Sequence, residues 1–191
     1  MYNNKVMKVK FKVVIFTDLD GSLLHRDTFK FDTIKNYISS LVDEGIIIIP
    51  NSRKTEKEIE NFNEELGVDL PYISENGSSI HGLNLINHNF PNKIILSREK
   101  EEIQKIFNEK IPEQLKDKCI QISKMNKKEQ EKIFGQKDDK LKNALNRKYT
   151  SPFLFKGDKN EKNTLSKILN SNSLTLQEGG RVINLCDNIN K

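Results

Sequence analysis

The sequence predicts an α/β fold in which a short parallel sheet precedes a second, α+β unit. Three observations predict it. In the first 80 residues, short apolar runs suited to strands alternate with segments whose apolar residues recur at helical spacing. Each of those apolar runs ends in polar residues. From about residue 81 the alternation stops, and strands and helices become segregated along the chain.

The predicted strands and helices of the first part are short, and capping or glycine residues mark where the helices start or end. The first strand, residues 13–16, is a β-branched run suited to burial on both faces. Apolar residues at helical spacing over 31–42, stopped by Gly45, predict a helix. Residues 46–49 predict the second strand. Thr55 and Glu58 form a capping box for a second helix that ends at Gly67, and residues 72–74 predict a third strand.

The carboxyl ends of these three strands carry the candidate site. Asp18 and Asp20 follow the first strand, Ser52 follows the second, and Glu75 and Asn76 follow the third. Parallel sheets place their ligands at this edge, so these side chains are expected to converge.

The two aspartates can divide the chemistry between them. One carboxylate of such a pair can attack as a nucleophile while the other moves protons. The Gly21-Ser22 turn lets a bound group approach the backbone closely. A solvated turn and a calcium loop are the alternatives. An EF-type loop needs Asp or Asn at alternate positions and Gly at the sixth, whereas here Gly is fourth and a strand leads in.

The second part predicts an α+β unit without repeats. A hairpin is expected from arms at 173–177 and 182–185 joined at Gly179-Gly180. The remaining expected elements are strands at 94–96 and 153–155, and helices over 97–110, 123–134, 138–148 and around 165–169.

Composition limits the function classes. The chain has 191 residues, a net charge of +5 and no Trp, and its lysines are interspersed with acidic residues, which argues against nucleic-acid binding. The longest aliphatic run, residues 46–49, is too short to span a bilayer, and no secretion signal is recognisable. Two distant cysteines, Cys119 and Cys186, fit a reducing cytoplasm. Three histidines in polar, loop-like contexts receive no role: His25, His81 and His88.

Residues 16–24, Phe-Thr-Asp-Leu-Asp-Gly-Ser-Leu-Leu, resemble motif I of the haloacid dehalogenase (HAD) superfamily of phosphatases. Within it, the chain is similar to the mannosyl-3-phosphoglycerate phosphatase family. The further matching segments are Ser52-Arg53-Lys54-Thr55, Glu75-Asn76-Gly77, Arg147 with Thr150-Ser151-Pro152-Phe153, and Glu178-Gly179-Gly180-Arg181. The resemblance implies a HAD-like Rossmannoid core, residues 1–80, and an inserted α+β class II cap, residues 81–185, with residues 186–191 returning to the core.

The resemblance also implies residue roles. Asp18 would attack phosphorus and form an aspartyl-phosphate, and Asp20 would protonate the leaving oxygen and later activate water. Mg²⁺ would be held by the Asp18 carboxylate and the Asp20 backbone carbonyl. Ser52 and Lys191 would bind phosphate. Arg181, with Gly180 and Asn76, would bind the small-molecule sugar-phosphate substrate, and its planar fork would contact the substrate carboxylate or phosphate.

Each carried-over residue has an ordinary structural alternative. Ser52 can simply end a strand, Arg181 can be a solvated hairpin residue, and Glu75-Asn76-Gly77 can be only a turn.

Two departures from the family pattern stand out. Lys191, at the motif III lysine position, is the last residue, so the family's motif IV acidic metal ligands and the remaining core strands are absent. The first strand is then expected at an open sheet edge. Ser151 stands where the family usually has Glu, which affects a cap-side substrate contact.

Three functions follow as hypotheses. The first is a Mg²⁺-dependent phosphatase for mannosyl- or glucosyl-3-phosphoglycerate, weakened by truncation. The second is an inactive fragment, and the third is a sugar-phosphate-binding module. Another HAD sugar phosphatase is the alternative enzyme. The sequence does not determine the sugar or the oligomeric state.

Overall fold

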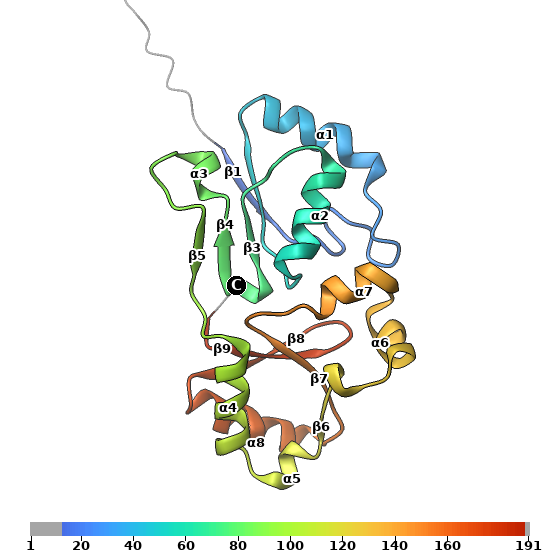
Figure 1. Ribbon diagram of the computed structural model, residues 1–191, viewed down its shortest axis with the longest axis vertical. Helices are drawn as coiled ribbons and strands as arrows, with labels where there is room; N and C mark the ends of the chain where they lie inside the picture. The colour runs from blue at the N-terminus through green and yellow to red at the C-terminus, as the bar shows by residue number, and fades with distance from the viewer. Residues whose placement is uncertain (1–12, 190–191) are drawn as a thin grey trace, which may run out of the picture.

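The computed structural model describes residues 13–189, which form two lobes one above the other (Figure 1). We call residues 13–95 the N-terminal lobe and residues 97–189 the C-terminal lobe. The N-terminal lobe holds strands β1–β5 and helices α1–α3, and the C-terminal lobe holds β6–β9 and α4–α8. The α/β fold with a parallel start and a separate α+β unit is confirmed. Among residues 13–189 no helix has the length and apolar character needed to cross a bilayer.

The parallel part of the N-terminal lobe is small. Strand β1 (Val14–Thr17) pairs in parallel with β2 (Ile47–Pro50), from Val14 opposite Ile47 to Thr17 opposite Pro50. A single parallel bridge between Asn51 and Ile73 then joins the end of β2 to β3 (Tyr72–Ser74). The three strands therefore end on the same side, as the sequence predicts.

Strands β4 (Ser79–His81) and β5 (Lys93–Ile95) form an antiparallel extension on β3; the sequence predicted a strand at residues 94–96, close to β5, but placed it in the second unit. Strand β4 pairs with β3, and β5 pairs with β4, with the short helix α3 (Leu83–Ile86) between them. Three consecutive residues of the β3–β4 turn have positive φ, which is 44° at Glu75, 65° at Asn76 and 94° at Gly77. This turn reverses the chain within three residues, so β4 follows β3 directly, although its polar sequence gives little strand signal.

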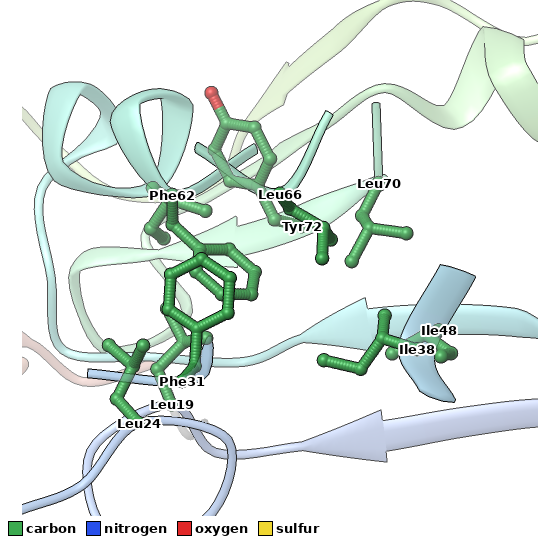
Figure 2. Close-up of a cluster of buried hydrophobic side chains, with 10 residues drawn as sticks. Leu19, Leu24, Phe31, Ile38, Ile48, Phe62, Leu66, Leu70 and Tyr72 are labelled. Atoms are coloured by element: carbon green, nitrogen blue, oxygen red, sulfur yellow. The ribbon is translucent and has the colours of Figure 1, made fainter. Parts of the chain in front are cut away.

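Helices α1 (Asp32–Asp43) and α2 (Glu56–Leu66) cover the sheet. The predicted capping box of Thr55 and Glu58 starts α2, and Gly67, with φ of 79°, ends it. Figure 2 shows buried side chains of the two helices packing on those of the strands and of the loop after β1. The rings of Phe31 and Phe62 are in contact, with 4.9 Å between their centroids. This core fixes the loops that follow β1 and β2.

Strand β1 lies at an exposed edge of the sheet. Its apolar side chains Val14, Ile15 and Phe16 are 45%, 37% and 63% exposed. The expectation that this run is buried on both faces is therefore wrong, while the expectation of an open edge is met. The reason is topological: in the described residues β1 has a partner strand on one side only, which is β2.

The C-terminal lobe is built on a four-stranded antiparallel sheet in the order β6-β7-β9-β8. The predicted hairpin is present as β8 (Leu174–Glu178) and β9 (Ile183–Asp187). Strand β7 is Ser151–Phe155, and the unforeseen strand β6 is only Cys119–Gln121. The sheet shares its core with the long helices α4 (Lys100–Lys110) and α8 (Lys159–Asn170).

Three shorter helices complete this lobe: α5 (Glu113–Lys116), α6 (Lys127–Phe134) and α7 (Asp138–Leu145). Helix α7 lies just below α2 in Figure 1, where the two lobes meet. The Thr55 hydroxyl donates to the Asn143 carbonyl at 2.9 Å across this junction. Strand β4 pairs with β3 and strand β5 pairs with β4, so both belong to the sheet of the N-terminal lobe. The domain boundaries at 80 and 185 stay predictions.

A buried polar cluster lies under the β3–β4 hairpin. The Ser79 hydroxyl is 2.8 Å from the Ser74 hydroxyl and 2.9 Å from His81 Nε2, while His81 Nδ1 is 3.5 Å from Glu56 Oε1. The His81 ring stacks on Tyr72 at 4.5 Å. His81 is therefore a core strand residue rather than a loop residue. Burial lowers its pKa to about 4, and the Glu56 carboxylate offsets part of that effect.

This low pKa predicts an acid-sensitive fold. The unfolded chain takes up the His81 proton near pH 6.5 but the folded chain only near pH 4. The contribution of His81 to stability is thus complete above pH 6.5 and is lost as pH falls toward 4, by about 3 kcal/mol in total. An NMR titration of the histidine rings should show the His81 midpoint near pH 4.

His81→Gln should flatten this part of the pH profile of the unfolding free energy, because Gln takes up no proton there. His88→Gln, at an exposed position, is the matched control and should leave the profile unchanged. A His81 midpoint near the ordinary value in the folded protein would contradict the prediction.

Candidate active site

A cavity of about 790 Å³ opens between the two lobes. Its walls come from the loop after β1, the loop after β2 and the β8–β9 turn of the C-terminal lobe. Five predicted site residues line it: Asp18, Asp20, Ser52, Gly180 and Arg181. The convergence expected from the strand ends is thus present for the first two strands.

The two aspartates are positioned by a tight turn at the end of β1. The Leu19 N–H donates to Asp18 Oδ1 at 2.9 Å, and the Leu19 side chain is fully buried. Gly21, at φ of 84°, closes the turn by donating to the Leu24 carbonyl at 2.8 Å. With Leu19 anchored in the core between them, both carboxylates line the cavity.

Ser52 lies in the loop that directly follows β2. Its side chain is buried, and its hydroxyl accepts a hydrogen bond from the Lys54 N–H at 3.3 Å. Its backbone N–H donates to the Ile73 carbonyl at 3.0 Å, which ties the loop to β3. The hydroxyl hydrogen is therefore available to an anion in the cavity.

Lys54 is a site residue that sequence reasoning missed. Its ammonium lies 3.2 Å from Asp20 Oδ1, 3.4 Å from Glu58 Oε1 and 4.7 Å from the centroid of the Phe29 ring. The Lys54 side chain is only 9% exposed, so these partners hold it firmly. It fixes the Asp20 carboxylate at the cavity wall. Its sequence signals were its place in the family-like segment Ser52-Arg53-Lys54-Thr55 and its position next to the capping box.

The C-terminal lobe contributes the β8–β9 turn. Arg181 donates through Nη1 to the Phe134 carbonyl, and its guanidinium lies 5.6 Å from the centroid of the Phe29 ring. From the opposite lobe, Arg53 Nη1 donates to the Glu178 carbonyl at 2.9 Å. The turn is thus held over the cavity by contacts to both lobes.

One predicted residue in the described part of the chain, Asn76, does not line this cavity. Asn76 is buried away from it, and its amide nitrogen contacts Cys186 Sγ at 3.7 Å. Burial raises the pKa of that thiol to about 12. Lys191 lies outside the described residues.

Glu75 joins the two lobes through a buried carboxylate. Its Oε1 accepts from the Lys148 N–H at 2.9 Å, and its Oε2 accepts from the N–H groups of Tyr149 and Thr150 at 3.1 and 3.0 Å. The Thr150 hydroxyl adds a fourth hydrogen bond at 2.8 Å. The backbone N–H of Glu75 donates to the Lys54 carbonyl at 2.9 Å. The alternative in which residues 75–77 form only a turn omits this role.

The carboxylates present fit a hard divalent cation. Mg²⁺ prefers oxygen ligands and is commonly held by one or two carboxylates together with water and phosphate oxygens. Asp18 and Asp20 both line the cavity and supply the two carboxylates. Residues 13–189 contain no cluster of three or more acidic, histidine or cysteine side chains that could enclose a metal by themselves.

Comparison with known proteins identifies the family. A family profile described as haloacid dehalogenase-like hydrolase matches residues 15–186. The chain belongs to the haloacid dehalogenase-like hydrolase family.

Curated HAD relatives carry more specific names. The chain is 31% identical over 182 residues to a glucosyl-3-phosphoglycerate/mannosyl-3-phosphoglycerate phosphatase of Persephonella marina, covering 91% of this chain and 66% of the relative. A protein of the same name from Methanococcoides burtonii is 35% identical over 102 residues, 53% of this chain and 34% of the relative. The mannosyl-3-phosphoglycerate phosphatase of Pyrococcus horikoshii is 45% identical over 67 residues, 35% of this chain and 27% of the relative. The chain therefore spans less than two thirds of the length of these relatives.

Solved structures agree on the fold. Thermoplasma acidophilum 0175 matches with a TM-score of 0.60 at 15% identity, covering 92% of this chain and 64% of that chain. A haloacid dehalogenase-like hydrolase from Bacteroides thetaiotaomicron matches with a TM-score of 0.61 at 14% identity, covering 93% and 71%. At these identities the likeness bears on the HAD fold alone.

The Glu75 contacts predict that the nearly isosteric substitution Glu75→Gln lowers the free energy of unfolding. In Glu75→Gln an amide nitrogen replaces one acceptor oxygen, so one or more of the four bound donors loses its partner. Buried donors left unsatisfied cost about 1–3 kcal/mol in unfolding free energy. Urea denaturation should show this loss. Glu101→Gln, at a side chain that is 73% exposed, is the matched control and should change stability by less than about 0.5 kcal/mol. Equal midpoints for the two variants would contradict the role of Glu75.

Proposed function

We propose that this HAD chain is a Mg²⁺-dependent phosphatase that hydrolyses mannosyl-3-phosphoglycerate or glucosyl-3-phosphoglycerate. One observation carries the proposal: two carboxylates at the end of β1 share a cavity with the Ser52 hydroxyl and with several arginines. The names of the curated relatives support the substrate class. A cytoplasmic location and a role in compatible-solute synthesis belong to the same proposal.

The reaction proceeds in two displacements. An Asp18 oxygen forms a bond to phosphorus while the bond from phosphorus to the glycerate oxygen breaks, giving an aspartyl-phosphate. Asp20 donates its proton to the departing oxygen, which leaves as the hydroxyl of the glycosylglycerate. Asp20 then takes a proton from water, and that water attacks phosphorus and regenerates the Asp18 carboxylate with release of phosphate. Lys54, 3.2 Å from Asp20, keeps this carboxylate at the cavity wall during both steps.

Mg²⁺ would be held by the Asp18 carboxylate and the Asp20 backbone carbonyl. When bound, it offsets the negative charge that phosphate and nucleophile bring together. Ser52 donates to a phosphate oxygen, and Arg181 and Gly180 contact the substrate from the β8–β9 turn. In this proposal the core of residues 1–80 supplies the reacting groups, and the cap of residues 81–185 contributes Gly180 and Arg181 to substrate binding.

A sugar-phosphate-binding module is the second candidate. The abundance of arginine around the cavity favours anion binding whether or not turnover follows. The two candidates differ in phosphate release, which only the phosphatase performs.

The test is Asp18→Asn in the full chain. The amide cannot attack phosphorus, so Mg²⁺-dependent phosphate release from mannosyl- and glucosyl-3-phosphoglycerate should fall by about 10³-fold or more. EDTA should abolish release by the unaltered chain. Asp43→Asn, which removes the same charge at an exposed position of α1, is the control and should keep full activity.

Release unaffected by Asp18→Asn would overturn the mechanism. Binding of both compounds without any release by the unaltered chain would favour the binding module.

A further inference from the structure

The arginines of this chain divide into two groups by their partners. Four line the cavity: Arg26, Arg53, Arg147 and Arg181. Within residues 13–189 none of these four forms an ion pair with a carboxylate. Arg98, which does not line the cavity, pairs with Asp187 at 2.6 Å. Among the described residues, the arginines without an ion-paired carboxylate are therefore the four that line the cavity.

The cavity arginines that do make hydrogen bonds make them to neutral groups. Arg53 donates to the Glu178 carbonyl, and Arg181 donates to the Phe134 carbonyl. Arg147 donates to the carbonyls of Ala144 and Arg53 and to the Thr150 hydroxyl. Arg26 makes no hydrogen bond to any other residue in the described part of the chain. These contacts orient guanidinium groups without neutralising them.

The acidic side chains of the cavity do not offset this charge. Its carboxylates are Asp18, Asp20, Asp27 and Glu58. Asp20 and Glu58 both pair with Lys54, and Asp18 faces the reacting phosphate in the proposed mechanism. With Lys30 and Lys54, the lining has six cationic side chains against four carboxylates, and a bound Mg²⁺ would balance a phosphate dianion, so positive charge remains for a second anionic group.

Two of the four arginines meet at the β8–β9 turn. A Cβ added at Gly180 would lie 3.4 Å from Arg26 Nη2, and one added at Gly179 would lie 2.9 Å from Arg53 Nη1. The two glycines thus allow guanidinium groups from two separate loops of the N-terminal lobe to reach the same turn. Arg26 comes from the loop after β1 and Arg53 from the loop after β2.

We propose that Arg26 and Arg53 form a subsite for a carboxylate on the substrate, in addition to the phosphate site at Asp18. The inference rests on the proposed function and assigns to these two residues the recognition of the glycerate carboxylate. The planar guanidinium fork matches a carboxylate better than it matches the hydroxyls of a sugar. The subsite selects phosphate esters that carry a second anionic group and disfavours plain sugar phosphates, which lack one.

The probes are D-3-phosphoglycerate and glycerol 3-phosphate, which share the phosphate and differ in the carboxylate. Calorimetry with the full chain should give about tenfold tighter binding of 3-phosphoglycerate, as expected for a charge-assisted pair of hydrogen bonds. In Arg26→Gln the preference should fall to about twofold or less. Lys110→Gln, which removes one positive charge at an exposed position outside the cavity, should keep the full preference.

Equal binding of the two probes by the unaltered chain, no binding of 3-phosphoglycerate at millimolar concentration, or an undiminished preference in Arg26→Gln would each overturn the subsite. Arg53→Gln is a second variant with the same expected direction, and thermal unfolding of each variant checks that it folds.

The outcome separates this inference from the phosphatase assignment. A carboxylate preference in a chain that releases no phosphate upholds the subsite and rejects the enzyme. Phosphate release that is equally efficient with and without a carboxylate on the substrate upholds the enzyme and rejects the subsite.

Discussion

The arrangement of the two lobes depends on the buried carboxylate of Glu75. It binds three consecutive backbone N–H groups and the Thr150 hydroxyl at the start of β7, while its own N–H holds the Lys54 carbonyl. One residue therefore connects the loop that carries Ser52 to the segment that leads into β7, a central strand of the C-terminal sheet. The cavity exists because these two parts are kept at a fixed separation, and the β8–β9 turn reaches the aspartates for the same reason.

Much of the N-terminal lobe could be predicted because its signals are local. The capping box at Thr55 and the glycine stop at Gly67 depend on residues within one helix, and both are present. The two catalytic candidates followed from a strand that ends in Asp18 and Asp20. Strand β4 was missed because its pairing depends on the positive-φ turn at Glu75 and Asn76 rather than on its own polar sequence.

The parts of the site that were missed depend on contacts distant in sequence. Lys54 meets Asp20 across 34 positions, and Arg53 meets the Glu178 carbonyl across 125. Nothing near Arg26 in the sequence indicates that it lies beside Gly180. Asn76 shows the opposite error, since a residue at a strand end was expected in the cavity but packs against Cys186 instead. Its backbone turn directs the side chain into the core.

The first turn of α2 has a consequence for the chemistry. Glu58 closes the capping box with Thr55 and also pairs with the ammonium that restrains Asp20. The start of an ordinary helix and the orientation of Asp20, the proposed proton-transferring group, thus belong to one continuous network. Fraying of that single helical turn, by mutation or by heat, would release the acid well before the protein as a whole unfolds.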